Sequence, residues 1–279
     1  MTSLWGSTYV VIQGAIADVP PSVVTLVRFG LAALCFIPFL VTPFRKRDRQ
    51  LAIAGLELGI WIVAGYTTQS IGLLYTTVNR SAFITGLYVI GVPVFYFLLG
   101  QSVRWLFWLA AGIALCGIGL LSYEGAPPNI GDVWTLGTAV GYTLFICRLE
   151  VHIPKFNVLA LSGAQLWGTT AIAFVWVAIG QTEWLAPSHW AGLPWRSLLY
   201  LGIIATALTT LGQTWGQRFV SPAPAAVIYT LEPVWASVFA FVLIGERLGM
   251  QGLLGAGAII GATLLCQLGG APPESSTDA

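Results

Sequence analysis

Ten apolar stretches follow one another along the chain, and short groups of charged, proline and glycine residues separate them. All but the first reach the length of about 20 residues that a helix needs to cross a bilayer. Uninterrupted apolar runs of this length fit helices rather than barrel strands. The pattern predicts an all-α polytopic membrane protein with ten transmembrane helices, at approximately residues 1–16, 21–42, 51–74, 79–99, 103–123, 131–149, 157–180, 195–217, 222–244 and 249–268.

The ten stretches read as two copies of one pattern of five. Four sets of positions align between the copies: Trp5-Gly6-Ser7 with Gly141-Tyr142-Thr143, Arg28 with Gln165, Pro93 with Pro233, and Gly117 with Gly261. Because five is an odd number, the second copy enters the membrane in the opposite orientation, and inverted repeats are typical of secondary transporters. We predict two five-helix repeats, residues 1–126 and 130–268, and a disordered tail over residues 269–279.

The first stretch is shorter than its counterpart in the second copy. Span six begins about ten residues before Gly141, whereas little of the chain precedes Trp5. We therefore expect the start of span one to be missing from the sequence or unusually short. No basic region or small-residue cleavage site precedes it, so it does not read as a removable signal peptide.

Lys and Arg are distributed unevenly over the loops. With the N-terminus inside, eight of them fall on the cytoplasmic side and three fall outside, namely Arg80, Arg196 and Arg247. This bias favours cytoplasmic N- and C-termini, with the basic run Arg45-Lys46-Arg47 as a topology anchor. The composition agrees, because 57% of residues are hydrophobic and 8% are charged, against about 25% charged in soluble domains.

Several kinds of chemistry find no support in the sequence. The formal net charge of +1 carries no sign of a nucleic-acid partner. The four cysteines lie inside spans without CxxC spacing, and His152 and His189 fall in loops, too isolated for a metal site. No phosphate-binding loop is present. We expect no metal and no cofactor, and the expected partners are a small-molecule substrate and the lipid bilayer.

Glycines recur at helical spacing in two spans. They are Gly112, Gly117 and Gly119 in span five and Gly257 and Gly261 in span ten. Small residues at such spacing favour close backbone approach between membrane helices. The approach serves packing within the chain or contact in a dimer, and we favour packing and a monomer.

Two spans carry polar side chains on one helix face. In span eight these recur at steps of four, three and four: Thr206, Thr210, Gln213 and Gln217. In span four they are Ser81, Thr85, Tyr88 and Tyr96. Such faces either line a substrate pathway or hydrogen-bond between packed helices. We favour the pathway for span eight and leave span four open between the two, with Tyr88 as the residue to test.

Aromatic rings are abundant within the spans. Many Trp residues near span ends suit interfacial belts. Others lie mid-span or near polar neighbours: Trp61, Tyr66, Tyr142, Trp167, Trp215, Tyr229 and Trp235. A cavity lined by such rings favours apolar or aromatic ligands and attracts an ammonium group. This suits an amino acid better than a sugar phosphate, which asks for two or more convergent Lys or Arg.

Ionisable residues inside the membrane are costly and point to function by default. Arg28 either binds a carboxylate, snorkels to the interface, or pairs with a carboxylate or carbonyl as a structural lock, and we favour a structural role. Glu57 lies near the cytoplasmic end of span three, where it can pair with Arg45 or Arg49.

Glu232 is followed by Pro233, which removes a backbone donor and frees a carbonyl four residues back. The carboxylate receives a substrate ammonium or a proton, or else it forms a charge pair or stabilises the kink as a buried, neutral acid. We predict that spans three, four, eight and nine rock about kinks at Pro93 and Pro233, and so expose a midplane cavity to each side in turn.

An ordered set of short motifs resembles the EamA-type ten-helix branch of the drug/metabolite transporter superfamily over essentially the whole chain. The motifs are Trp5-Gly6-Ser7-Thr8, Pro21 with Arg28, Leu231-Glu232-Pro233-Val234, and Gly245-Glu246-Arg247-Leu248. The resemblance implies two inverted repeats around a central cavity and export or exchange of small metabolites. Similarity to aromatic amino-acid exporters implies amino-acid export across a bacterial inner membrane. Carriage of phosphorylated or nucleotide sugars is the alternative, and a membrane-embedded enzyme is least favoured.

The first half departs from the pattern of the second. It has Val92-Pro93 where the second half has Glu232-Pro233, and Gly100-Gln101 where the second has Gly245-Glu246. It is also about five residues shorter between proline and turn, so we expect a truncated span four.

Together these considerations give a predicted site. Its substrate-binding residues are Thr85, Tyr88, Tyr142, Thr210, Gln213, Trp215, Tyr229 and Glu232. Its gating or structural residues are Arg28, Glu57, Pro93 and Pro233.

Overall fold

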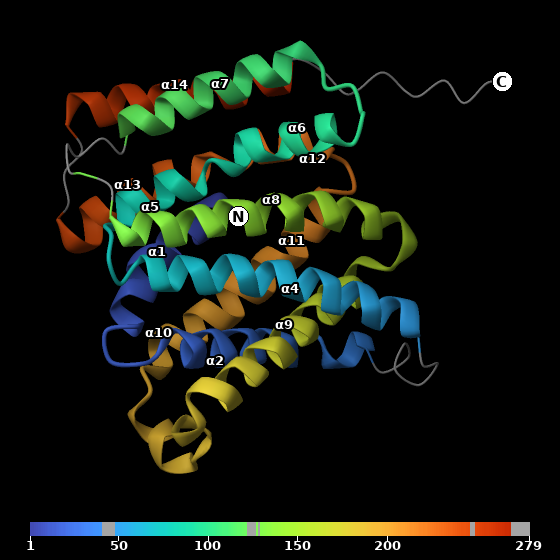
Figure 1. Cartoon of the computed structure of the whole chain (residues 1–279), viewed down its shortest axis with the longest axis vertical. Helices are drawn as coiled ribbons and strands as arrows, with labels where there is room; N and C mark the ends of the chain where they lie inside the picture. The colour runs from blue at the N-terminus through green and yellow to red at the C-terminus, as the bar shows by residue number, and fades with distance from the viewer. Residues whose placement is uncertain (41–47, 122–126, 128, 246–248, 269–279) are drawn as a thin grey trace.

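A computed structural model of the chain describes residues 1–40, 48–121, 127, 129–245 and 249–268, and within them all regular secondary structure is helical (Figure 1). The first half contains α1 (Thr2–Ala15), α2 (Pro21–Leu34), α4 (Arg49–Gly72), α5 (Val78–Thr85), α6 (Tyr88–Leu98) and α7 (Trp105–Leu121). The second half contains α8 (Ile130–His152), η1 (Ile153–Lys155), α9 (Val158–Gly180), η2 (Thr182–Leu185), η3 (Pro187–Gly192), α10 (Trp195–Leu199), η4 (Tyr200–Leu208), α11 (Thr209–Gly216), α12 (Pro222–Tyr229), α13 (Leu231–Ile244) and α14 (Met250–Leu268).

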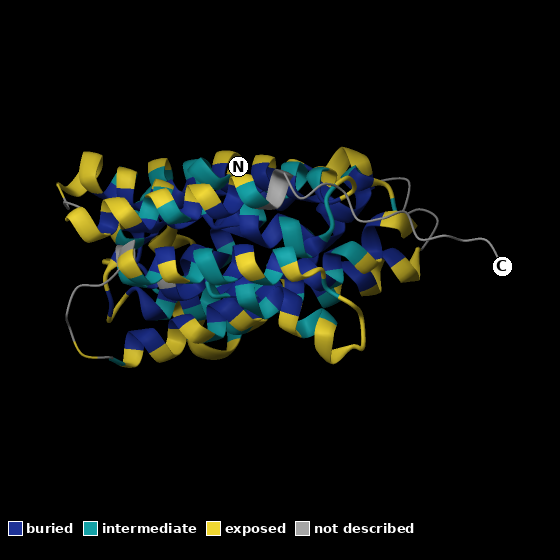
Figure 2. Ribbon diagram, turned by 90° about the horizontal axis from the view of Figure 1, so that it is seen from above, coloured by how far each residue is buried: buried dark blue, intermediate teal, exposed yellow. Residues whose placement is uncertain are grey.

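Helical segments occupy each of the apolar stretches predicted from the sequence. Five of the described segments are long and apolar enough to cross a membrane: Arg49–Gly72, Ile130–Lys155, Val158–Gly180, Trp195–Gly216 and Pro222–Ile244. Large apolar side chains face outward from the bundle, as the exposed fractions of Ile179 (81%) and Leu98 (76%) illustrate (Figure 2). An apolar exterior around a helical bundle is the surface that lipid requires.

Some sequence features lie outside the described residues. They are the basic run Arg45-Lys46-Arg47, Pro128, the turn Glu246-Arg247-Leu248, the side chain of Cys266 and the tail 269–279.

Helices α4 and α9 cross at a contact where glycines allow the backbones to touch. A side chain at Gly55 would overlap the backbone of Ala164, and one at Gly59 would lie 2.7 Å from the backbone carbon of Gly168. Gly168 in turn lies against the backbone of Gly55. Close approach of this kind is how membrane helices gain packing energy without a hydrophobic driving force between them.

The two halves contact each other in matched pairs. Helix α1 packs along α13, and α8 packs along the corresponding pair α5 and α6. Helices α7 and α14, the last of each half, lie side by side along one edge of the bundle (Figure 1). At that contact a side chain at Gly117 would lie 2.8 Å from the carbonyl oxygen of Gly255.

The other glycines of these two spans do not pack as expected. A side chain at Gly112, Gly119, Gly257 or Gly261 would meet no described atom within 4 Å. The internal packing predicted for Gly257 and Gly261 is therefore wrong, because these residues lie on the outward face of α14 while Gly255 makes the contact with α7.

Spans four and nine are each interrupted. The first breaks at Gly86 and Leu87, between α5 and α6, and the second at Thr230, between α12 and α13. Pro233 lies in the first turn of α13, directly after its break, as predicted. Pro93 instead lies inside α6, so the interruption of span four is not at the predicted kink.

Span four is also less truncated than expected. Residues Val78–Leu98 cover nearly the same length as Pro222–Ile244, because span four begins farther ahead of its proline. Both spans end at a glycine with a left-handed backbone, Gly100 (φ 77°) and Gly245 (φ 74°). Glycine adopts this conformation without steric cost and commonly ends helices for that reason.

We predict that Gly168→Ala destabilises the protein, because its new methyl group would meet the backbone of Gly55 and separate α4 from α9. Overpacking of this kind costs about 1–3 kcal/mol. Gly112→Ala is the matched control, since the same methyl group there meets open space. Thermal unfolding in detergent measures both, and equal unfolding temperatures for the two variants would contradict the crossing.

Candidate substrate site

A cavity lies in the middle of the bundle, where helices of the first half face helices of the second. It contains about 640 Å³ of space between atoms, including the part that is open to solvent. Its lining residues are Trp5, Thr8, Phe29, Ile62, Tyr66, Gln69, Tyr88, Tyr142, Phe145, Ile146, Thr209, Thr210, Gln213, Tyr229 and Glu232. Helices α1, α2, α4 and α6 of the first half and α8, α11, α12 and α13 of the second half therefore all contribute to its lining.

Aromatic residues make up seven of the fifteen lining residues, and several of their rings pack against one another edge-to-face. The ring centroids are 4.9 Å apart for Phe29 and Tyr66, 5.5 Å apart for Tyr66 and Tyr142, and 5.2 Å apart for Trp5 and Tyr229. Such T-shaped pairs are worth about 0.5–1.5 kcal/mol beyond the area that they bury. These contacts favour the observed positions of the rings around the cavity.

One corner of the cavity is acidic. Glu232 lies in the first turn of α13, after the break at Thr230, and its residue is 7% exposed. A helix N-terminus favours a negative charge at this position. The Tyr9 side chain from α1 lies beside the Glu232 carboxylate, and Thr85 and Gln69 lie beside Tyr9. The interrupted span thus places a carboxylate where a ligand in the cavity can reach it.

A buried cation lies behind the part of the cavity wall that Phe29 and Tyr66 form. The Arg28 Nε donates a hydrogen bond to Thr206 Oγ1 at 2.6 Å, and the guanidinium carbon is 4.6 Å from the centre of the Tyr66 ring. Arg28 is 1% exposed, so it does not snorkel to the interface. Its Thr206 partner lies in η4, a π-helical stretch of span eight, and π-helical turns are frequent at functional sites.

The structure brings most of the predicted substrate-binding residues together. Six of the eight line the cavity: Tyr88, Tyr142, Thr210, Gln213, Tyr229 and Glu232. Thr85 is fully buried beside Tyr9, one layer behind the lining. Trp215 does not line the cavity, because it is 60% exposed on the outside of the bundle and packs edge-on against Phe219 at 5.3 Å.

Sequence reasoning named Tyr66 among the rings of a cavity but missed its neighbours Ile62 and Gln69 on the same face of α4. Ile62, Tyr66 and Gln69 follow one another at steps of four and three, which places them on the same side of a helix. Tyr142 Oη donates a hydrogen bond to Gln69 Oε1 at 3.4 Å. The available signal was Gln69, an amide inside a membrane span and three residues after Tyr66.

Glu57 lies away from the cavity, and its partners differ from those expected. Its carboxylate pairs with Arg148 and lies 2.9 Å from His152 Nε2. Both partners belong to α8, which continues through residues that we assigned to a loop. One turn away, the Tyr96 hydroxyl donates to the Glu150 carboxylate. This group ties α4 and α6 to the end of α8 and supports a structural role for Glu57.

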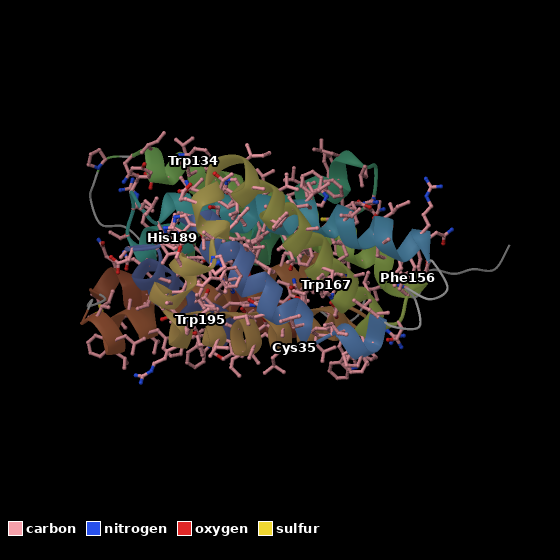
Figure 3. The ribbon with its side chains drawn as sticks, turned by 90° about the horizontal axis from the view of Figure 1, so that it is seen from below. Cys35, Trp134, Phe156, Trp167, His189 and Trp195 are labelled. Carbon is pink, nitrogen blue, oxygen red and sulfur yellow. The ribbon has the colours of Figure 1, made fainter. Side chains whose placement is uncertain are left out.

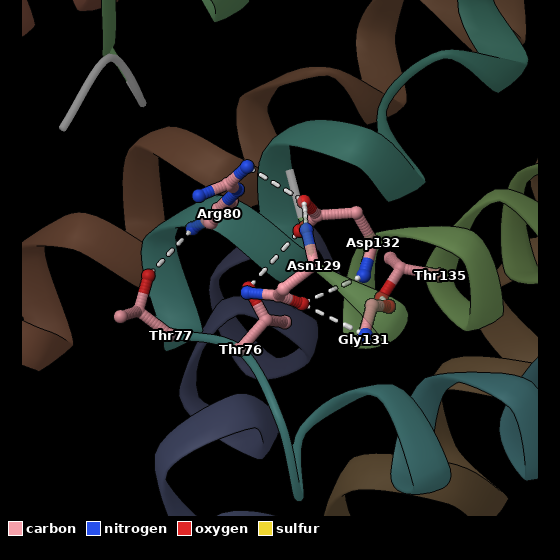
Figure 4. Close-up of polar contacts among 7 residues, drawn as sticks. All are labelled: Thr76, Thr77, Arg80, Asn129, Gly131, Asp132 and Thr135. Atoms are coloured by element: carbon pink, nitrogen blue, oxygen red, sulfur yellow. Dashed lines mark hydrogen bonds and ion pairs between the residues drawn. The ribbon is translucent and has the colours of Figure 1, made fainter. Parts of the chain in front are cut away.

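A second polar group fastens the opposite end of α8 (Figure 4). Arg80 Nη2 lies 2.6 Å from Asp132 Oδ2, and the Thr76 hydroxyl donates to Asp132 Oδ1 at 3.2 Å. Asn129 and Asp132 form a capping box that begins the helix. The start of α5 and the start of α8 are thereby joined across the two halves.

The two histidines are far apart. His189 lies in η3 at one end of the bundle, whereas His152 lies near Phe156 at the other end (Figure 3). Within the described residues no three His, Cys, Asp or Glu side chains are grouped so that they could hold a metal ion.

Comparison with known proteins agrees with the arrangement of the chain. The model of the EamA-like transporter family matches it over residues 1–123 and again over residues 129–267. An uncharacterized transporter of Archaeoglobus fulgidus is 29% identical, over 95% of this chain and 82% of that protein. A biotin transporter of Salmonella typhimurium is 24% identical, over 66% of this chain and 62% of that protein.

A solved crystal structure shares the fold. It superimposes with a TM-score of 0.74, covers 96% of this chain and 94% of its own, and is 16% identical in sequence. The family match and the relatives named transporters show that this helical bundle with an apolar exterior is a multi-pass membrane transporter and not an enzyme. The chain belongs to the EamA-like transporter family.

The access of a water-soluble reagent to the cavity can be tested without a substrate. In a variant that lacks native cysteines, we expect Thr210→Cys to react readily with a small charged thiol reagent, because Thr210 lines the cavity. Thr214→Cys, one turn along α11, should stay largely unmodified, since Thr214 is 0% exposed and its hydroxyl accepts a hydrogen bond from Gln165 Nε2 at 3.0 Å. Mass spectrometry of the intact protein measures both rates. Faster labelling of the Thr214 variant would place the cavity on the wrong face of α11.

Proposed function

We propose that the protein is a secondary transporter that exports amino acids, aromatic ones included, across a bacterial inner membrane. The observation that carries this proposal is a cavity between the two halves in which one carboxylate, Glu232, faces a wall of aromatic rings. The carboxylate attracts an ammonium group, and the rings stack on an aromatic side chain. Alternating access around this cavity is the proposed transport mechanism.

The proposed architecture is ten transmembrane helices in two inverted repeats, residues 1–126 and 130–268, with both termini in the cytoplasm. Two observations support it. The family model matches the chain twice in succession, and the contact of α1 with α13 has its counterpart in the contact of α8 with α5 and α6. The bias of Lys and Arg supports the orientation.

In the proposed site, Glu232 receives the ammonium group of the substrate. Tyr88, Tyr142 and Tyr229 surround the side chain of the substrate. Thr210 and Gln213 supply hydrogen bonds from α11, and Thr85 supports the acidic corner from behind. All except Thr85 line the cavity.

The residues of the cavity support transport of phosphorylated sugars less well than transport of amino acids. A dianionic phosphate asks for convergent Lys or Arg side chains. The described lining contains neither residue type, and its ionisable acid is a carboxylate that repels a phosphate. The cavity therefore favours the amino acid.

Counterflow into proteoliposomes tests the function. We expect preloaded vesicles to accumulate radiolabelled Trp and Phe faster than Thr, and all three faster than a hexose phosphate, because ring stacking adds to ammonium binding. Biotin belongs in the panel because relatives carry the name biotin transporter. Accumulation of the hexose phosphate alone, or of biotin alone, would overturn the amino-acid proposal while leaving a transporter.

Two tryptophans of the chain provide a matched pair of variants for this assay. Trp5→Leu removes a ring from the cavity wall and should weaken counterflow of Trp and Phe. Trp215→Leu removes an equal ring from the lipid-facing surface and should leave counterflow unchanged.

The break before Pro233 predicts a hinge. Pro233→Ala restores a backbone donor for the Tyr229 carbonyl, and a hydrogen bond of about 1 kcal/mol would stabilise a continuous helix. We expect maximal transport to slow by about fivefold with little change in the half-saturating concentration. Pro93→Ala should change the rate less, because span four breaks at Gly86 and Leu87 instead. Initial rates over a range of substrate concentrations separate the two quantities, and lost affinity at an unchanged rate would refute the hinge.

A further inference from the structure

Arg28 carries a charge that the described structure leaves without an ionic partner. Its side chain is 1% exposed and lies deep in α2. The Nε donates to Thr206, whereas Nη1 and Nη2 have no hydrogen-bond partner among the described residues. The described ion pairs involve Arg80, Arg148 and His152, and not Arg28.

A charge held in this way is costly. A buried cation is tolerated when it is paired and its donors are satisfied. The neutral Thr206 hydroxyl and the Tyr66 ring stabilise the guanidinium only in part. The two unpaired nitrogens form the fork that a carboxylate fills with two parallel hydrogen bonds.

The Tyr66 ring separates Arg28 from the cavity. One side of Tyr66 faces the lining, and the guanidinium lies over its ring at 4.6 Å. The ring contacts Phe29 and Tyr142 edge-on, and the Tyr66 hydroxyl also lies within hydrogen-bonding reach of Tyr142. Rotation of Tyr66 breaks these contacts and its cation–π contact with Arg28, and it uncovers the fork.

The cavity then has two opposite charges, one from each half of the protein. Arg28 belongs to α2 of the first half, and Glu232 belongs to α13 of the second. The two charges attract one another, yet the ion pairs among the described residues do not join them. A ligand that carries both an ammonium and a carboxylate satisfies both, whereas an amine or an acid satisfies only one.

We propose that Arg28 is the carboxylate-binding residue of the cavity, uncovered when Tyr66 turns aside, and that the site selects zwitterionic α-amino acids over amines and over simple carboxylic acids. This inference rests on the proposed amino-acid transport, and it assigns a specificity to that site. It gives Arg28 a role in ligand recognition rather than in holding α2 against η4.

Four ligands that share a phenyl ring test the proposal in wild-type proteoliposomes. They are L-phenylalanine, L-phenylalaninamide, phenethylamine and 3-phenylpropionate. We expect counterflow of L-phenylalanine to exceed that of each of the others by about 30-fold, since a desolvated charge pair is lost in every case. Equal counterflow of the amino acid, its amide and the amine would overturn the role of Arg28 while leaving amino-acid transport in place.

Variants separate recognition from structure. Arg28→Met should abolish the preference for L-phenylalanine over phenethylamine, and Arg28→Lys should retain part of it. Gln165→Met is the matched control, because Gln165 is the counterpart of Arg28 in the second half, is also fully buried, and carries no charge. It should lower stability without changing the preference.

The ratio of amino acid to amine is the deciding quantity. Equal losses for both ligands in Arg28→Met, with elution and thermal unfolding like those of Gln165→Met, would show that Arg28 is structural. Should Arg28→Met fail to fold, the wild-type ligand series and Arg28→Lys decide the same question. Wild-type protein that transports neither L-phenylalanine nor L-tryptophan would overturn the proposed function, and this inference with it.

Discussion

Contact between glycines on α4 and its two neighbours is the constraint on which the rest of the structure depends. Gly55 and Gly59 bring α4 against α9, while Gly65 meets the Tyr142 ring and Gly72 meets Thr135 on α8. Lipid offers no hydrophobic force between helices, so van der Waals contact at such short range has to hold them. Ile62, Tyr66 and Gln69 continue the face of Gly55 and Gly59 at steps of three and four, and farther along the helix this face lines the cavity.

Much of the fold and part of the site could be predicted from the sequence, since both depend on periodicity. A step of three from Thr210 to Gln213 keeps the two side chains on one helix face, and both line the cavity. Trp215 was grouped with them for its polar neighbours, yet two further residues turn a helix by about 200°, which carries the ring to the opposite side. Trp215 is close to these residues in the sequence, but its angle around the helix axis determines which side of the helix it faces.

Other features could not be read from one sequence because they depend on partners from distant segments. Tyr9 looks like an ordinary ring in an apolar span, and its place beside Glu232 arises only when α1 packs along α13. Glu57 was matched with basic residues near it in sequence, whereas Arg148 reaches it from α8. The interruption at Gly86 and Leu87 could not be predicted either, because Pro93, the residue that indicated a kink, lies inside α6 instead.

The π-helical stretch η4 changes the directions in which the residues of span eight face, although it hardly changes the length of the span. A π-helical turn accommodates one more residue than an α-helical turn, so it shifts the angular register of the residues on either side of it. Thr206 faces Arg28 within this stretch, and Gln213 faces the cavity after it. Loss of one residue from η4 would preserve the hydropathy of the span and nearly all of its length. It would nevertheless rotate one end of span eight against the other by about 100°. Thr206 could then no longer face Arg28 while Gln213 faces the cavity.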